Sequence, residues 1–172
     1  FEAYKKEHHV ANCDFQLSDI GQGGIYQQYD RLISFEVIEH LQKEESVKKM
    51  VQLLKPGGMA VISVPHKWWI FEMHGAKLPL LEWNRVPFFS WLPTFLHERF
   101  ANARIYTKKR IRKLLENSGL EVMNIDYKTT PLDVLPDSKI KSFLLKYIFK
   151  GDTTCIPFFS PCFFVYARKA SN

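Results

Sequence analysis

Three side chains that lie close together in the sequence can take part in chemistry: Glu36, Glu39 and His40. Glu36 and His40 are four residues apart, so a helical turn would place them on one face. Two carboxylates and an imidazole are groups that Mg²⁺ or Mn²⁺ accepts as ligands. Acidic residues are equally common in the first turn of a helix, because they complement its dipole. We therefore assign no metal from this pattern, and both interpretations stay open.

His66 is the candidate catalytic residue, because it follows Pro65 at the end of an apolar run. An imidazole, whose ordinary pKa is about 6.5, suits the task of a general base on a hydroxyl group. The alternative is a histidine that hydrogen-bonds the backbone of a loop. His74 and His97 lie in a long connection and rank below His66 as candidates.

Apolar periodicity predicts the elements that would position these side chains. Short apolar runs, alternating or continuous, predict strands at 14–20, 30–35, 59–64, 121–128 and 163–168. Helical spacing of apolar residues predicts helices at 43–54 and 106–118, the first of them ended by the run Lys-Pro-Gly-Gly at 55–58. Strands that alternate with helices indicate an α/β fold with a mostly parallel sheet. Ligands of such sheets bind at the carboxyl ends of the strands, here after Ile20, Phe35 and Val64.

The composition is that of a globular domain: among 172 residues, 46% are hydrophobic and 24% are charged. These fractions exclude a disordered tail, a collagen-like repeat and a coiled coil. The formal charge of +6 permits an anionic partner without requiring one. Cys13, Cys155 and Cys162 show no C-x-x-C spacing, which favours a reducing compartment over a disulfide framework or a zinc site. We expect a cytoplasmic protein, since the longest apolar run is too short to span a bilayer.

Two segments exceed what a minimal fold of this kind needs, namely 66–105 and 130–160. The first holds all 4 tryptophans, and connections of this length are usually functional. We interpret it as a lid over an apolar or amphipathic acceptor; contact with a membrane surface and a second small core are the alternatives. The second contains a short amphipathic helix near 140–149.

A basic run at 108–113 fits the solvent face of a helix, with a phosphate-binding patch as the alternative.

Three motifs in the right order carry a resemblance to a known family. These are YDRLISFEVIEHL at 29–41, LKPGG at 54–58 and MAVISVP at 59–65. Together they resemble the class I S-adenosylmethionine-dependent methyltransferases, and the likeness covers most of the chain outside the two insertions. It implies a Rossmann-like α/β fold with helices on both faces of the sheet. It also implies S-adenosylmethionine as cofactor.

The resemblance implies which residues contact the cofactor. Asp19 and Ile20 are similar to the acidic turn that reads the adenine amino group, since a carboxylate accepts that donor. The residues that end the second strand would face the methionine and ribose portions. The implied set is Asp19, Ile20, Ser34, Phe35, Glu36 and His40.

One part of the family pattern is missing, namely the Gly-rich turn after the first strand. The glycines at 21, 23 and 24 stand too close to Glu36 to replace it. The sequence therefore resembles the C-terminal two-thirds of a methyltransferase domain, incomplete at its N-terminus. We expect the strand at 30–35 to become an exposed edge, the strand at 14–20 to lack its neighbour, and the isolated segment to be unstable and to bind cofactor poorly.

The expected function is methyl transfer from S-adenosylmethionine to a small or lipid-like acceptor, most simply O-methylation. Such a transfer needs alignment and exclusion of water rather than a nucleophilic triad. One alternative is metal-dependent RNA 2′-O-methylation, because some enzymes with an E-x-x-E-H run bind metal there. Another is a non-catalytic fragment or binding module. Contact with a membrane through 66–105 stays an alternative, and nucleic acid ranks below a small acceptor.

Overall fold

The computed structural model describes residues 2–20, 27–78, 81–83, 86–130, 132 and 135–171. The helices are α1 (Glu2–Glu7), α2 (Val47–Gln52), α3 (Thr94–Phe100), α4 (Lys108–Asn117) and α5 (Lys139–Tyr147). The strands are β1 (Tyr29–Phe35), β2 (Leu54–Pro65), β3 (Ala76–Leu78), β4 (Leu81–Trp83), β5 (Leu120–Lys128), β6 (Thr153–Thr154) and β7 (Cys162–Lys169).

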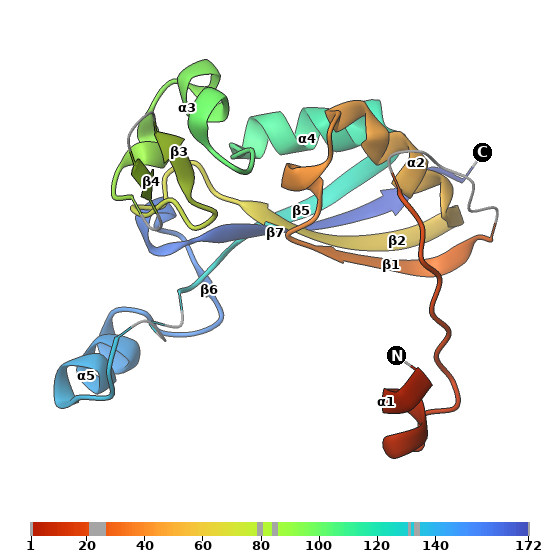
Figure 1. The fold of residues 1–172 in the computed structure, drawn as a ribbon, viewed down its shortest axis with the longest axis horizontal. Coiled ribbons are helices and arrows are strands. Elements are labelled where there is room, and N and C mark those ends of the chain that lie inside the picture. Colours follow the sequence, from red (N-terminus) through yellow and green to blue (C-terminus); the bar gives the residue numbers. More distant parts are fainter. Residues whose placement is uncertain are drawn as a thin grey trace.

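One five-stranded sheet with the order β1-β2-β7-β5-β6 organises the described part of the chain (Figure 1). β1 and β2 are parallel, as the crossover through α2 requires. β7 lies antiparallel between β2 and β5, and β6 pairs antiparallel with β5. The α/β sheet is therefore mixed, with its parallel pair at one side, and not mostly parallel as predicted. β1 is the edge strand of this sheet, as expected.

The core lies under α2 and α4, which cover the same face of the sheet (Figure 1). Met50 from α2 and Ile111 and Leu115 from α4 pack with Ile62 and Val165 from the sheet. Each such side chain contributes about 1.5–3 kcal/mol when it is fully buried. On the opposite face of the sheet the structure leaves large apolar side chains exposed, among them Ile33, Phe35 and Met123. Helices were expected on both faces of the sheet. In the described residues, the helices that pack on it, α2 and α4, lie on the same face.

Local differences from the predicted elements have physical reasons. The prediction of a strand at 14–20 is wrong. This segment runs irregularly and pairs with no strand among the described residues. The helix predicted at 43–54 is shorter, since a 3-10 helix at Glu44–Ser46 precedes α2. The run at 55–58 lies inside β2, where the register with β1 shifts between Tyr29 and Arg31.

The two insertions fold differently. In the first, Ala76, Val86 and Phe89 form a small second core beside the β3–β4 hairpin and α3. In the second, α5 stands away from the sheet (Figure 1). No helix among the described residues has the length and apolar character needed to cross a membrane.

Candidate active site

Glu36 lies at the carboxyl end of β1, and a serine on the neighbouring strand holds it in place. Phe35 is in register with Ser63, so the residue after the strand faces the Ser63 hydroxyl. The Glu36 backbone N–H donates to Ser63 Oγ at 3.1 Å, and that hydroxyl donates to Glu36 Oε1 at 2.6 Å. Glu36 has a φ of 52°, a left-handed conformation that a non-glycine residue seldom adopts. These two bonds help to hold the strained backbone in that conformation.

Glu39 presents a fully buried carboxyl group next to Glu36. It lies on a 3-10 helix at Ile38–His40, and its side chain is 0% exposed. Neither carboxyl oxygen accepts a hydrogen bond from a described residue. Burial, aided by the Glu36 carboxylate, raises the pKa of Glu39 to about 8. A buried carboxyl group of this kind is typical of a functional site.

His74 reaches this carboxyl pair from the first insertion. Its Nε2 lies 3.7 Å from Glu39 Oε1 and 3.8 Å from Glu36 Oε2. His40 Nε2 lies 3.8 Å from Glu39 Oε1, and the two imidazole rings are 5.1 Å apart. Burial lowers the pKa of His74, although the Glu36 and Glu72 carboxylates oppose that shift. We name Glu36, Glu39, His40 and His74 the carboxyl–imidazole cluster.

A buried pair from the same insertion supports His74. His97 Nε2 lies 2.6 Å from Glu72 Oε2, and both side chains are almost completely buried. The other oxygen, Glu72 Oε1, accepts a hydrogen bond of 3.0 Å from the His74 backbone N–H. Glu72 thus links His97 to the position of His74. Sequence reasoning ranked His74 and His97 low and did not consider Glu72, because these three residues show no motif spacing.

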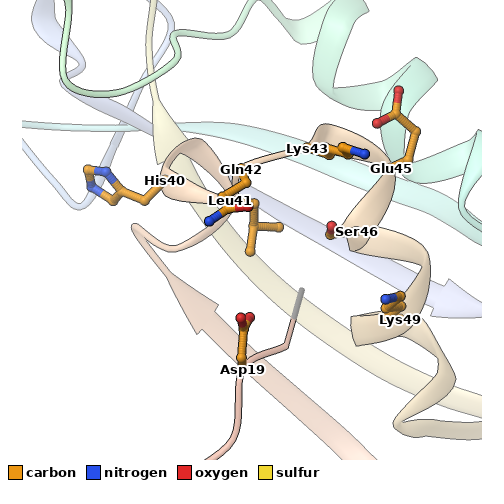
Figure 2. Close-up of a pocket in the computed structure, with 8 residues that line it drawn as sticks. All are labelled: Asp19, His40, Leu41, Gln42, Lys43, Glu45, Ser46 and Lys49. Carbon is orange, nitrogen blue, oxygen red and sulfur yellow. The ribbon is translucent and has the colours of Figure 1, made fainter. Parts of the chain in front are cut away.

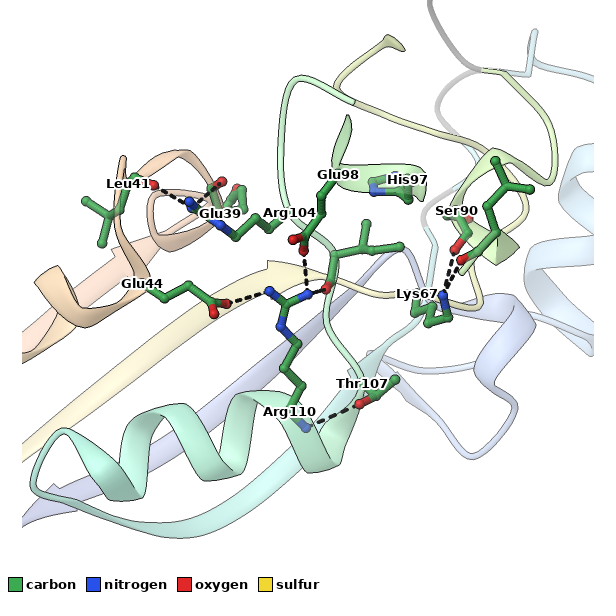
Figure 3. A network of polar contacts seen from close by, with 12 residues as sticks. Glu39, Leu41, Glu44, Lys67, Ser90, His97, Glu98, Arg104, Thr107 and Arg110 are labelled. Atoms are coloured by element: carbon green, nitrogen blue, oxygen red, sulfur yellow. Dashed lines mark hydrogen bonds and ion pairs between the residues drawn. The ribbon is translucent and has the colours of Figure 1, made fainter. Parts of the chain in front are cut away.

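Two arginines tie the segment that follows the cluster, 41–44, to α4 and to the insertion (Figure 3). Arg104 donates to the backbone carbonyls of Leu41 and Gln42, directly after the 3-10 helix. Arg110 on α4 bridges the Glu44 and Glu98 carboxylates. Arg110 was predicted to lie in a solvated basic face, but its guanidinium is half-buried in this network.

A cavity of about 480 Å³ opens beside the cluster, and it brings together two of the predicted cofactor residues, Asp19 and His40. Figure 2 shows the Asp19 carboxylate pointing toward Leu41, whereas the His40 ring points away from both of these residues. Volumes of this order suit a small-molecule ligand. The other lining residues are Gln42, Lys43, Glu45, Ser46 and Lys49.

The other predicted cofactor residues lie mostly in a second cavity. This cavity of about 330 Å³ runs along β1 and has a largely apolar lining, which includes Ile20, Ser34 and Phe35. Ser34 is buried and its hydroxyl has no hydrogen-bond partner among the described residues. The glycines considered as a cofactor turn, at 21, 23 and 24, fall outside the described residues. Asp19 lines the first cavity and the orphaned Ser34 hydroxyl the second; both side chains can hydrogen-bond a nucleoside, but they do not line one common cavity.

His66, the predicted base, lies apart from the carboxyl–imidazole cluster. Its backbone bridges to Tyr106, and its ring packs at 4.5 Å from Phe163 and 5.0 Å from Tyr127, between ring centroids. The residue is 2% exposed, so an acceptor would have to displace core side chains to reach it. Burial lowers the pKa of His66 to about 4. His74, by contrast, lies next to the Glu36 and Glu39 carboxyl groups.

Buried His66 makes the chain sensitive to acid. The unfolded chain binds a proton near pH 6.5 and the folded chain only near pH 4, so stability falls as pH drops through that window. We expect His66→Leu to be within about 1 kcal/mol of the parent at pH 7, yet about 2 kcal/mol more stable than it at pH 5. Urea unfolding across this range measures the difference. The exposed His8→Leu serves as control, and equal pH slopes for parent and His66→Leu would contradict the expectation.

Comparisons with known proteins agree with this architecture. The chain is similar to S-adenosylmethionine-dependent methyltransferases of solved structure. One from Mesorhizobium loti is 14% identical with a TM-score of 0.56, the match covering 97% of this chain and 75% of that one. One from Methanosarcina mazei is 12% identical with a TM-score of 0.55, covering 92% and 68% of the two chains. One from Clostridium acetobutylicum is 10% identical with a TM-score of 0.58, covering 98% and 69%.

These likenesses confirm the predicted Rossmann-like fold. No curated protein sequence matches the chain. A family model described as a methyltransferase domain matches residues 3–125, which is more than half of the chain. The match includes β1, β2 and the carboxyl–imidazole cluster, so the cavity and the cluster belong to the matched domain. The chain is thus a member of the methyltransferase domain family, with the fold of enzymes that use S-adenosylmethionine.

Proposed function

We propose that this protein transfers a methyl group from S-adenosylmethionine to a hydroxyl group of a small or lipid-like acceptor. The observation that carries this proposal is the contact of His74 with buried Glu39 at the carboxyl end of β1. Methyl transfer to an alcohol needs a group that removes the hydroxyl proton. The cluster supplies such a group beside the cavity that contains Asp19.

His74 is the base in this proposal. Since burial lowers its pKa, its imidazole is neutral near pH 7 and Nε2 can accept a proton. Once the proton is bound, the Glu36 and Glu72 carboxylates stabilise the imidazolium. Glu39, whose pKa is about 8, is mostly protonated at that pH, and its buried carboxyl group lies beside His74 Nε2 and positions the base.

The cofactor would be held mainly by the first cavity. Asp19 accepts the adenine amino group in the proposal, and the loop at 41–46 forms the opposite wall. When bound, S-adenosylmethionine supplies a methyl group on a positively charged sulfur, which leaves as the neutral thioether of S-adenosylhomocysteine. The protein needs to hold acceptor and cofactor in line and to keep water out.

The aromatic side chains of 66–105 support an apolar or amphipathic acceptor. Trp68, Phe71, Phe88 and Trp91 are all partly exposed in the segment that also supplies His74. Large aromatic side chains typically line pockets for apolar ligands. The acceptor would therefore meet the base and an apolar surface from the same segment.

Labelled methyl transfer tests the proposal. The full-length protein would be incubated with methyl-labelled S-adenosylmethionine and a panel of phenols, fatty alcohols and amines. We expect label in hydroxyl acceptors and none in the amines. Label in amines alone would contradict O-methylation, and no label in any compound would contradict the proposed activity.

Asp19→Ala tests the cofactor cavity separately. Because it removes an acceptor for the adenine amino group, we expect affinity for S-adenosylhomocysteine to fall about 10-fold, a loss typical of one hydrogen bond to a charged group. Isothermal titration measures the change. Asp14→Ala, an exposed acid in the same segment, is the matched control. Equal losses in both variants would show that Asp19 does not mark the site.

A second candidate function is metal-dependent methylation of an RNA 2′-hydroxyl. The observation that favours it is that ligand atoms of Glu39, His40 and His74 lie within 4.8 Å of one another. A divalent cation there would be held by one carboxylate and two imidazoles. Transfer to an RNA 3′ end that a chelator abolishes and Mn²⁺ restores would support this candidate. Transfer unchanged in chelator would remove it and leave His74 as the base.

A further inference from the structure

Helix α5 exposes an apolar face that no other described element covers. Ile140, Phe143 and Tyr147 are 72%, 56% and 61% exposed, respectively. Their spacing, three and then four residues, places them on one side of the helix. Ile148, the residue after the helix, is also exposed. Burying such side chains in an apolar environment is favourable, so this face is suited to a partner.

Lysines surround this apolar face. Lys139, Lys141, Lys146 and Lys150 fall within or next to α5, and no acidic residue lies between Ser138 and Gly151. Lys141 pairs with Asp137 at 2.9 Å, a surface ion pair that contributes little. An apolar stripe bordered by lysines matches a surface that is negatively charged outside and apolar beneath.

A second exposed surface lies where the two insertions meet. Trp91 from the first insertion meets Phe158 from the second, with ring centroids 5.5 Å apart. Phe88 and Trp68 lie 4.9 and 6.5 Å from Trp91, and all four rings are partly exposed. We name these four residues the aromatic edge. Trp is typical of the boundary between membrane and water.

We propose that α5, together with the aromatic edge, docks the protein on an anionic phospholipid bilayer. The helix would lie in the plane of the headgroups, with Phe143 and Tyr147 in the acyl boundary and the lysines among the phosphates. The charge argues against a second copy of this chain as occupant, because pairing two α5 helices would bring two sets of lysines together. A bilayer offers both the apolar layer and the negative charge.

The proposal goes beyond methyl transfer and does not require it. It does suit a lipid-like acceptor, because the aromatic edge belongs to the insertion that also supplies His74. Docking is measured without cofactor or acceptor, so a failure of docking leaves the proposed activity to its own test.

Vesicle co-sedimentation tests the proposal. The full-length protein would be mixed with vesicles of phosphatidylcholine alone, or of phosphatidylcholine with roughly 30% phosphatidylserine. We expect at least 10-fold stronger partitioning to the anionic vesicles, reduced by salt as electrostatic attraction requires. No binding to either vesicle, or equal binding to both, overturns the proposal.

Substitutions locate the docking surface. We expect the triple variant I140Q/F143Q/Y147Q to lose at least 10-fold in partitioning. Met123→Gln, which removes an exposed apolar side chain from the sheet, should leave partitioning unchanged. Circular dichroism would verify that each variant is folded. Equal losses in the triple variant and in Met123→Gln would overturn the assignment to α5.

Charge is tested in the same way. Lys146→Gln should weaken binding about 5-fold, the value of one lysine near an anionic surface. Lys113→Gln on α4 is the matched control and should have no effect.

If chromatography without vesicles shows a dimer that the triple variant disrupts, the face is an interface between copies. If the lysine variants instead lose affinity for RNA alone, the partner is nucleic acid. Either result refutes bilayer docking.

Discussion

Glu39→Leu is expected to lower methyl transfer strongly while it increases the stability of the folded chain. Leucine is close to glutamate in size but places neither a carboxyl group nor a hydrogen-bond donor beside His74. Misplacing a reacting group by about 1 Å costs roughly 100-fold in rate, so we expect a loss of that order when the group that positions His74 is removed. Removing an ionisable group from a buried site without hydrogen-bond partners is stabilising. The two effects have opposite signs, so simple misfolding cannot produce them.

The pH dependence makes this expectation specific. In the folded chain Glu39 binds its proton up to about pH 8, whereas in the unfolded chain it loses the proton near pH 4.5. The parent therefore loses stability as pH rises through that window, by roughly 1.4 kcal/mol for each unit of difference in pKa as an upper bound. Glu39→Leu should lack this loss, so the two melting temperatures should diverge from about pH 5 to pH 8. Parallel curves, or retained activity, would contradict the role given to Glu39.

His97→Leu is expected to destabilise the chain by about 3 kcal/mol, the usual cost of leaving one partner of a buried hydrogen-bonded pair unsatisfied. The variant leaves the Glu72 carboxyl group buried without its 2.6 Å partner. Because Glu72 also accepts the His74 backbone N–H, methyl transfer should fall as well. Urea unfolding and the rate of transfer measure the two effects.

A double-mutant cycle separates the pair from the packing of its side chains. Glu72→Gln combined with His97→Leu removes both ionisable groups, so it should be less destabilising than the sum of the single changes, by about 1–3 kcal/mol. His97→Gln can still hydrogen-bond Glu72 and should recover part of the activity. If the single effects simply add, the Glu72–His97 contact does not hold His74 in place.

The parts of the fold that could be predicted are those whose residues carry their own pattern. The apolar runs of β1, β2 and β7 and the 3.6-residue spacing of α4 place those elements within a few residues of their actual bounds. The segment 14–20 has the same kind of local pattern and forms no strand. A strand needs a neighbour for its backbone hydrogen bonds, and pairing is a long-range property. For the same reason the pattern does not indicate that β2 starts as early as Leu54, where its partner is Tyr29.

The candidate site divides in the same way. Glu36, Glu39 and His40 were found because they lie within five residues of one another. Ser63, Glu72, His74 and His97 come from other elements, and only the folded chain brings them to the cluster. His66 has the sequence context of a base, but the burial that isolates it depends on Phe163 and Tyr127, which arrive from the far end of the chain.

The left-handed backbone at Glu36 has a consequence for how the site and the sheet respond to stress. A single hydroxyl, that of Ser63, both receives the Glu36 amide proton and donates to its carboxylate, so the two bonds exist only while β1 and β2 stay paired. Fraying of the edge strand would break both together, and the backbone could then relax and swing the carboxylate away. Local opening of β1 and displacement of the Glu36 carboxylate from the site are thus one cooperative event.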